Sequence, residues 1–236
     1  MLGWMYEVLI ETPFYGYRKV YEAIKELFEV TLKQIRRIMR QFGLKGLRKK
    51  KKTSISNKLH KKYPYLLKDY KISFPNQVWA MDITYVNMRG CCVCMTAIID
   101  LYSRKVLSRR ISNAMEKEFC ISALEEALSK YGEPCIFNSD QGSQYTSEEF
   151  IRILEAHKVR ISMDGKGRAM DNIYIERFWK TIKYEDIKFK YYSEISELKE
   201  GVANFVRFYN ENRFHQSLGY ETPEEFYCEP FSQAFN

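Results

Sequence analysis

The sequence predicts an α/β domain built on a mixed five-stranded sheet and preceded by a small helical module. Apolar residues recur at helical spacing in the first 44 residues, whereas residues 78–163 hold five short strand-like runs and two helical patterns. A lysine-rich segment without acidic residues separates the two parts. We expect residues 1–47 to form the module, 48–73 a basic linker and 74–230 the α/β domain, with a helical extension from about residue 190.

The N-terminal module has the pattern of a helix-turn-helix. Val20, Ile24 and Leu27 keep helical spacing, and Thr31 with Gln34 predicts a capping box at the start of the next helix. The apolar side of that helix would consist of Leu32, Ile35, Ile38 and Met39. Its outer side would be basic, with Lys33, Arg36, Arg37 and Arg40. A DNA-binding motif and an ordinary amphipathic helix pair, ended by Gly43, both fit this pattern.

The linker carries most of the excess charge. The chain has a net charge of +8, and Lys45–Lys62 holds nine Lys or Arg residues and no acid, so the remainder is nearly neutral. Such a run is compatible with a solvated spacer. It also suits a polyanion, because clustered bases release counterions from DNA phosphates. The candidate DNA contacts here are Lys49, Lys50, Lys51 and Lys52.

Three antiparallel strands are expected to open the α/β domain after Pro75. Residues 78–86 alternate in polarity, so one face would consist of Val78, Ala80, Asp82 and Thr84. The opposite face would consist of Trp79, Met81, Ile83 and Tyr85. A turn at Arg89 and Gly90 leads to a second strand over 91–100, and a third follows over 105–111.

The remaining elements alternate between helix and strand. A helix is expected over 116–130, ended by Gly132, and a fourth strand over 134–138. Thr146 with Glu149 predicts the cap of the next helix, which a fifth strand over 159–163 follows. A loop over 164–170 and helices near 171–187 and 194–211 complete the chain. This order of elements is that of a ribonuclease-H-like domain.

Three acidic residues are expected to converge in such a fold. Asp82 lies in the middle of the first strand, Asp140 directly after the fourth, and Glu176 on a helix that leans over both. Lys180 and Lys183 follow Glu176 on the same side of that helix. Three converging carboxylates repel one another unless a cation lies between them, and hard oxygen ligands favour Mg²⁺ or Mn²⁺. Two such ions would support an in-line phosphoryl transfer.

Each acid also has a purely structural interpretation. Asp82 could be a hydrogen-bonded strand residue, Asp140 a turn former and Glu176 an ion-pair partner of Lys180. The metal interpretation is favoured because the element order agrees and 35 residues separate Asp140 from Glu176.

The cysteines do not form a zinc-binding pattern. The chain has six cysteines and three histidines, and the cysteines are not arranged in paired short spacings. Cys91, Cys92 and Cys94 fall in a strand-like apolar run, so we expect them to be buried core residues in a reduced, cytoplasmic protein. The N-terminus has no signal-peptide pattern, and no apolar run reaches the length of a membrane span.

Five segments carry a close resemblance to a known family. They are WAMDITY, IIDLYSRKVLS, NSDQGSQYTS, SMDGKGRAMDNIYIERFWKTIKYE and FYNENRFHQSLGYETPEEFY. Together they resemble the second-frame (orfB) transposases of bacterial insertion sequences, in the DDE group of the retroviral-integrase superfamily. The similarity extends from about Tyr15 to Tyr227.

The resemblance implies an activity and a set of residues. It implies catalytic, metal-binding Asp82, Asp140 and Glu176 with two Mg²⁺ ions, for which Mn²⁺ can substitute, and DNA contacts by Lys180 and Lys183. Asn172 matches the motif without an assigned role. Family members hydrolyse a strand at the element end, and the freed 3′-hydroxyl then attacks a phosphodiester without ATP.

The resemblance also implies partners. Double-stranded DNA, both element ends and target, and a homo-multimer assembled on it are expected. Many relatives carry His where this chain has Asn138, a difference that we expect to be tolerated. Relatives of this type are usually fused by frameshifting to an upstream frame that supplies another helix-turn-helix and a leucine zipper, so activity could require such a partner.

Two other functions stay open at this point. A DNA-binding regulator would use the N-terminal residues to occupy element ends without catalysis, and a nuclease would cut without strand transfer. The intact acidic triad favours the transposase over the regulator, and the two lysines after Glu176 favour transfer over simple cleavage.

Overall fold

The computed structural model describes residues 1–46, 63–88, 91–114, 116–164 and 172–233. The chain forms two compact units, Met1–Ile55 and Ser56–Asn236. The expected basic run at Lys49–Lys52 and the expected loop at 164–170, except Asp164, lie outside the described residues.

The N-terminal unit contains three helices, α1 (Leu2–Glu11), α2 (Tyr17–Ile24) and α3 (Leu32–Gln41). Their shared core consists of Met5, Val20, Ile24, Ile35 and Met39. The capping box at Thr31 and Gln34 is confirmed, with both reciprocal hydrogen bonds present. Two expectations are wrong. Leu27 does not continue the helical spacing, because α2 ends at Ile24, and Leu32 in the first turn of α3 is exposed instead of inward.

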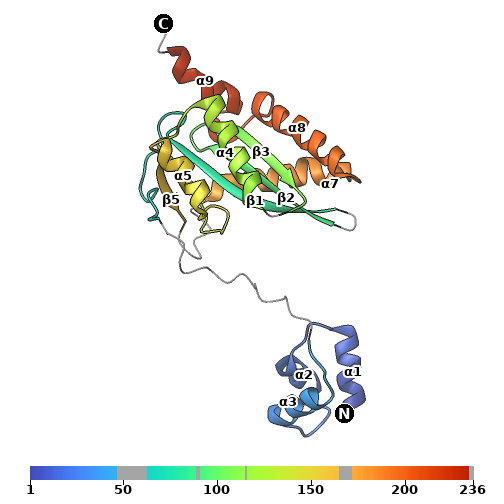
Figure 1. Ribbon diagram of the computed structural model, residues 1–236. Coiled ribbons are helices and arrows are strands. Elements are labelled where there is room, and N and C mark those ends of the chain that lie inside the picture. The colour runs from blue at the N-terminus through green and yellow to red at the C-terminus, as the bar shows by residue number, and fades with distance from the viewer. Residues whose placement is uncertain (47–62, 89–90, 115, 165–171, 234–236) are drawn as a thin grey trace. The chain divides into compact units, whose positions relative to one another are not determined.

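The C-terminal unit is built on a five-stranded mixed sheet with the order β3-β2-β1-β4-β5, which confirms the expected fold class (Figure 1). β1 (Val78–Met88) pairs antiparallel with β2 (Cys91–Asp100), and β2 pairs antiparallel with β3 (Val106–Ser112). β4 (Ile136–Ser139) and β5 (Arg160–Met163) add parallel strands on the other side of β1. β4 ends beside the middle of β1, and Asp82 and Asp140 lie at this point.

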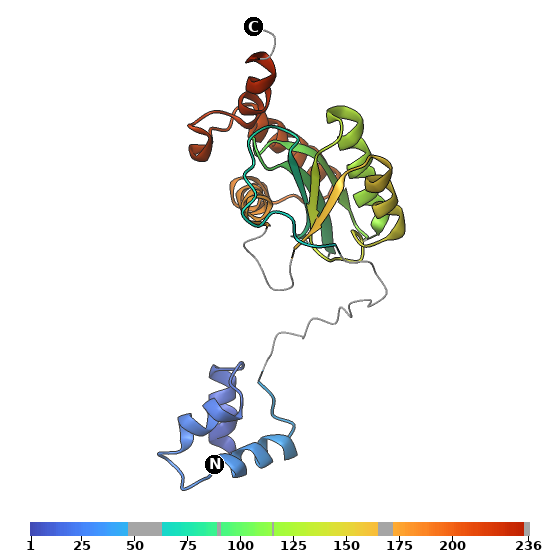
Figure 2. The same ribbon diagram turned by 90° about the vertical axis from the view of Figure 1, so that its left-hand side faces the viewer.

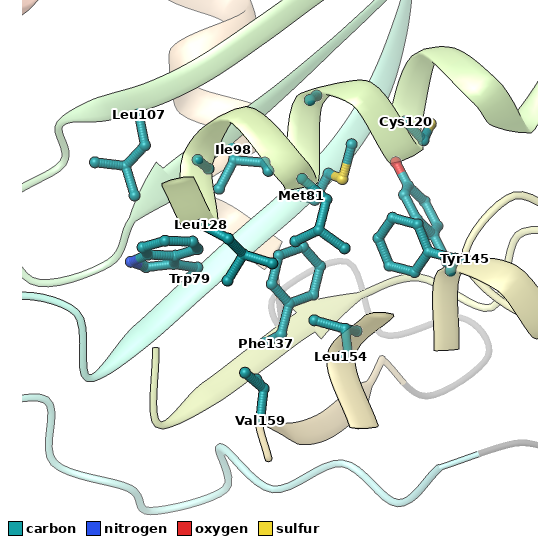
Figure 3. Close-up of a cluster of buried hydrophobic side chains, with 14 of the residues drawn as sticks. Trp79, Met81, Ile98, Leu107, Cys120, Leu128, Phe137, Tyr145, Leu154 and Val159 are labelled. Atoms are coloured by element: carbon teal, nitrogen blue, oxygen red, sulfur yellow. The ribbon is translucent and has the colours of Figure 1, made fainter. Parts of the chain in front are cut away.

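Helices cover both faces of the sheet (Figure 2). α4 (Lys117–Tyr131) and α5 (Glu148–Ala156) pack on the face that carries Trp79 and Met81 (Figure 3). α6 (Ile173–Ile182) and α8 (Ile195–Glu211) pack on the opposite face, against Val78 and Ala80. The expected alternation along β1 is therefore confirmed, and Asp82 belongs to the α6 face.

The chain stays helical after α6, but the type of helix changes. A π-helical turn, η2 (Lys183–Ile187), and the short α7 (Lys188–Lys190) precede α8. After α8 come the 3₁₀ turn η3 (Gln216–Leu218) and a further helix, α9 (Pro223–Gln233). The expectation that helices near 171–187 and 194–211 complete the chain is wrong, because Thr222 and Glu225 cap α9 and Tyr227 anchors it in the core.

Two further expectations are corrected. The cap of α5 is Ser147, since the Thr146 hydroxyl donates to the Gly142 carbonyl within the preceding turn. Cys94 is buried in the strand run as expected, but Cys92 is exposed because it lies near the β1–β2 turn. None of the described helices is both long enough and apolar enough to cross a membrane.

The close packing around Gly201 in α8 leads to a stability prediction. A Cβ at this position would overlap the Tyr192 phenol, whose hydroxyl donates to the buried Asp186 at 2.6 Å. Alanine gains about 1 kcal/mol over glycine in an open helix, but overpacking costs about 1–3 kcal/mol. Gly201→Ala should therefore lower the free energy of unfolding, measured by urea denaturation.

Two controls make this prediction specific. Gly3→Ala in α1 meets nothing within 4 Å and should not destabilise the chain. In a Tyr192→Ala background, Gly201→Ala should become neutral or stabilising. A stabilising effect in the wild-type background would show that Tyr192 does not restrict this position.

Candidate active site

β1 holds Asp82 in the middle of an otherwise apolar strand face. The residues two and four before it, Ala80 and Val78, are fully buried against the α6 side of the sheet. Strand periodicity places the Asp82 side chain on the same face. Its backbone pairs with Ala97 of β2, and its carbonyl accepts a hydrogen bond from the Thr96 hydroxyl at 3.0 Å. The position of this carboxylate is thus fixed by the central strand.

The register between β1 and β4 brings Asp140 to the same edge. Val78 pairs with Ile136 and Ala80 with Asn138 in parallel. Two residues further along, the same register would align Asp82 with Asp140, and neighbouring strands lie about 4.8 Å apart. Ile136 packs in the α6-side core, so the alternation along β4 assigns Asp140 to that side as well.

The turn after β4 leaves Asp140 exposed rather than buried. Its Oδ1 accepts a hydrogen bond from the Gly142 backbone N–H at 2.8 Å, which is the Asx-turn interaction. A Cβ at residue 142 would lie 2.8 Å from this same oxygen, so a larger residue there would have to displace the carboxylate. The turn interpretation and the ligand interpretation are therefore compatible, because the turn orients the carboxylate.

Helix α6 places Glu176 beside the two aspartates. Its inner side, formed by Ile175, Phe178, Trp179 and Ile182, is buried in the α6-side core. Trp179 Nε1 donates a hydrogen bond to Asp82 Oδ2 at 3.0 Å. Glu176 lies one helical turn before this contact and is exposed. In the described part of the chain, no ion pair joins Glu176 to Lys180, so that structural interpretation has no support.

The pKa of Asp82 reports this convergence. Burial, followed by the negative charges of Asp140 and Glu176, raises it to about 6, while hydrogen bonds from the Ile83 N–H and Trp179 act in the opposite direction. The ordinary value is about 3.9. Asp82 therefore carries its charge at neutral pH against an electrostatic cost that a nearby cation would remove.

The residues present fit a hard divalent cation. Three carboxylates from β1, the β4 turn and α6 supply oxygen donors only. Within the described ranges, no three His, Cys, Asp or Glu side chains are close enough together to hold a metal ion as they stand. Residues 165–171, which lead into α6, lie outside those ranges. Asp82 is half-buried on β1, whereas Asp140 and Glu176 are exposed.

The predicted DNA contacts near the acids differ in their surroundings. Lys180 is exposed on α6. Lys183 is half-buried, and its Nζ donates to the Thr84 hydroxyl on β1. The pKa of Lys183 is lowered by burial, and the charge of Asp82 acts in the opposite direction. Asn172 is the buried N-cap residue of α6, and its Oδ1 has no hydrogen-bond partner among the described residues.

The other predicted DNA contacts belong to the N-terminal unit and the linker. Four of them are exposed on α3, namely Lys33, Arg36, Arg37 and Arg40. Lys49 to Lys52 lie outside the described residues.

A buried polar network that the sequence did not reveal holds the end of β4. Asn138 Nδ2 donates to Asp164 Oδ1 at 2.8 Å, and the Ser162 hydroxyl donates to Asn138 Oδ1 at 2.7 Å. Gln141 Nε2 donates to the Asp164 carbonyl at 2.9 Å. The network ties the turn that carries Asp140 to the end of β5. Its signal in the sequence is a pair of small polar residues at the ends of two apolar strands.

Comparisons with known families agree with this geometry. A model described as an integrase core domain matches residues 73–169, and a second with the same description matches 157–223. A model described as an HTH-like domain matches residues 3–52.

Curated relatives are similar over most of their length. The InsK protein of insertion sequence element IS150 from Escherichia coli K12 is 31% identical over 217 residues, which cover 90% of this chain and 77% of the relative. The transposase of IS904 from Lactococcus lactis is 30% identical over 200 residues, covering 82% and 79%. The transposase InsF of IS3A from E. coli K12 is 30% identical over 205 residues, covering 84% and 71%.

Solved structures show the same fold at low identity. The HTLV-2 integrase catalytic core domain in complex with magnesium (dimeric form) has a TM-score of 0.53 at 21% identity, covering 65% of this chain and 97% of the other. A chain of the simian T-cell lymphotropic virus intasome in complex with PP2A regulatory subunit B56 gamma has a TM-score of 0.59 at 18% identity, covering 90% and 74%.

The integrase core, the HTH-like module and the extent of the similarity to insertion-sequence transposases lead to one conclusion. This chain belongs to the DDE transposases of bacterial insertion sequences, within the polynucleotidyl transferase superfamily.

Proposed function

We propose that Asp82, Asp140 and Glu176 are the catalytic carboxylates with which this transposase cleaves and joins insertion-sequence ends. The observation that supports the assignment is geometric: the β1–β4 register aligns Asp82 with Asp140, and the hydrogen bond from Trp179 to Asp82 brings α6, which carries Glu176, to the same place. An isolated structural acid on a strand would not experience two further carboxylates from distant parts of the chain. The three acids jointly provide what an oxygen-coordinated metal site requires.

Two Mg²⁺ ions, for which Mn²⁺ can substitute, are proposed to be held by these three carboxylates. Bound there, the ions would activate the attacking oxygen and stabilise the leaving one in an in-line phosphoryl transfer. Asp82 contributes a rigid anchor, since β1 fixes its backbone and Trp179 holds one of its oxygens. Asp140 contributes a carboxylate whose direction the Gly142 N–H sets.

The same residues serve both chemical steps. In the first step, water attacks a phosphodiester at the element end and releases a 3′-hydroxyl. In the second, that hydroxyl attacks a target phosphodiester, and the departing strand leaves with its own 3′-oxygen. Because one ester bond replaces another, the joining step needs no ATP. Lys183, held against β1 near Asp82, supplies positive charge beside the reacting phosphate.

DNA and further protein subunits are the proposed partners. Lys180 is exposed one turn after Glu176 and suits a backbone contact, as do the four exposed bases of α3. One solved chain with this fold belongs to a viral intasome, and we propose a multimer on DNA for this chain too. An upstream-frame protein or fusion is a further proposed partner, tested by adding it to the purified chain in a joining assay.

The first prediction concerns catalysis. Glu176→Gln should abolish joining of labelled element ends in the presence of Mg²⁺, because an amide is a poor ligand for this hard cation. DNA affinity should stay within a few fold of the wild type. Glu118→Gln, an exposed residue of α4, is the matched control and should leave joining intact. Wild-type joining by Glu176→Gln would refute the ligand assignment.

The second prediction concerns the cost of the Asp82 charge. Its folded-state pKa lies above the unfolded value, so the metal-free chain loses stability as the pH rises towards about 6 and beyond. Asp82→Asn keeps an acceptor for Trp179 and removes that cost. Without metal at pH 8 it should be more stable than the wild type by up to ~3 kcal/mol, and the difference should shrink as the pH falls towards 4.

Metal addition provides the complementary readout. At pH 8, Mg²⁺ or Mn²⁺ should raise the Tm of the wild type and leave that of Asp82→Asn nearly unchanged. Only the wild type has a charged carboxylate at residue 82 to bind the metal. Equal metal responses of the two proteins would contradict the site.

The third prediction concerns the basic linker. Replacing Lys49 to Lys52 with alanine should flatten the dependence of DNA affinity on salt, by about 0.9 in logarithmic slope for each phosphate that the lysines neutralise in the wild type. Sequence preference should not change. An unaltered slope would show that these lysines form only a spacer.

A further inference from the structure

A second basic site lies on the outer flank of α6. A cavity of about 540 Å³ is formed there by α6, the turn after β2, and the segment that follows α8. Its lining includes Arg104, Arg177, Lys180, Arg213 and His215. Only Lys180 among them is an expected DNA contact, so the other four have no function in the cleavage and joining chemistry.

The cavity and the carboxylates lie on different sides of the same helix. The α6 residues that line the cavity are Ile173, Tyr174, Arg177, Lys180, Thr181 and, just beyond its end, Tyr184. At 3.6 residues per turn these share one side, opposite the buried side formed by Ile175, Phe178 and Ile182. Glu176 and Lys183 lie between the two sides, on the flank that faces Asp82. Lys180 lies at the border and belongs to both surroundings.

The charge of the cavity is strongly positive. Four cations line it, against one acid, Glu185. That acid is already neutralised, because Arg213 donates to both of its oxygens at 2.8 and 2.7 Å. Arg177 and Lys180 are exposed and have no acidic partner among the described residues. The cavity therefore presents free cationic groups around a hollow rather than a closed ion-pair network.

Arg104 is held at the cavity at a conformational cost. Its backbone has a φ of 66°, in the left-handed region that disfavours residues other than glycine. Its guanidinium lies 3.5 Å from the ring centroid of Tyr174, and burial lowers its pKa. Its Nη1 is buried and has no hydrogen-bond partner in the described part of the chain. The side chain is half-buried and the charge of Asp100 offsets part of its desolvation, but the unpaired Nη1 leaves a cost that an anion in the cavity would remove.

We propose that this cavity binds a phosphodiester of the DNA backbone, a few nucleotides along the strand from the phosphate held at the carboxylates. The inference rests on the proposed function, since it takes Glu176 to mark the reacting phosphate. A helix is about 10–12 Å across with its side chains, and a DNA strand rises about 3.4 Å per nucleotide. The two phosphates are therefore about three nucleotides apart, and α6 spans the interval between them.

His215 makes the occupation of this cavity measurable. Its pKa is lowered to about 4 by burial and by the charges of Arg213 and Arg104, with Glu185 acting in the opposite direction. An anion close to the ring would favour the protonated form and raise that pKa by about 1 to 3 pH units. The chain has three histidines, and the exposed His157, on the other side of the sheet next to Glu133, serves as an internal reference.

The test is a histidine titration by NMR on the full chain, with EDTA and with or without a short DNA duplex. The duplex should raise the pKa of His215 and leave that of His157 unchanged. Arg177→Ala should abolish the rise at His215 and lower the salt slope of duplex binding by about 1. Arg152→Ala, which removes an exposed arginine from α5, is the matched control and should change neither quantity.

Three results would overturn the proposal. A His215 pKa that does not respond to the duplex would show that DNA does not enter the cavity. A His215 pKa that rises with inorganic phosphate but not with the duplex would indicate a site for the free ion. A response that depends on protein concentration without DNA would indicate a carboxylate of a second copy. The His215 pKa and the salt slope are both measured without metal. If the chain fails to join DNA with Mg²⁺ but its His215 still responds to the duplex, the result counts against the proposed catalytic residues only.

Discussion

The electrostatic cost of Asp82 in the middle of an apolar strand face is the constraint on which the rest of this structure depends. The strand buries its neighbours Val78 and Ala80 completely, and the hydrogen bond from Trp179 offsets only part of the cost of the charge. Asp140 and Glu176 then add negative charge at the same edge instead of relieving it. A fold stabilised for its own sake would place an apolar residue at 82. In the proposed function, a cation and a phosphate would offset this cost.

Helix α6 connects the core, the carboxylates and the basic cavity. Its buried side packs against β1 and α8, and Trp179 extends from that side to Asp82. Glu176 and Lys183 lie on the flank that faces Asp82. Arg177 and Tyr184 line the cavity. If both proposals hold, a single rigid element sets the spacing between the reacting phosphate and the next backbone contact. The contact between Gly201 and Tyr192 supports this helix indirectly, because Tyr192 holds Asp186 in the turn that continues α6.

The sequence predicted the sheet, the face of β1 that carries Asp82 and the buried side of α6, because these depend on local patterns with long-range regularity. Alternation along residues 78–86 assigned Asp82 to its face, and the helical spacing around Glu176 identified the buried side of α6. Features decided by tertiary contacts were missed. The cap of α5 is Ser147 and not Thr146, because the Thr146 hydroxyl donates to the Gly142 carbonyl. Helix α9 is anchored by Tyr227, which packs in the main core. The cavity was invisible to spacing rules, since Arg104, Arg177 and Arg213 come from three separate segments.

The most direct test of the central claim is a crystal of the chain soaked in Mn²⁺ and measured at the manganese absorption edge. The account predicts an anomalous peak with carboxylate oxygens of Asp82, Asp140 and Glu176 at about 2.0–2.6 Å, the range of hard-cation ligand distances. A peak elsewhere, or three side chains that stay apart at saturating Mn²⁺, would contradict it.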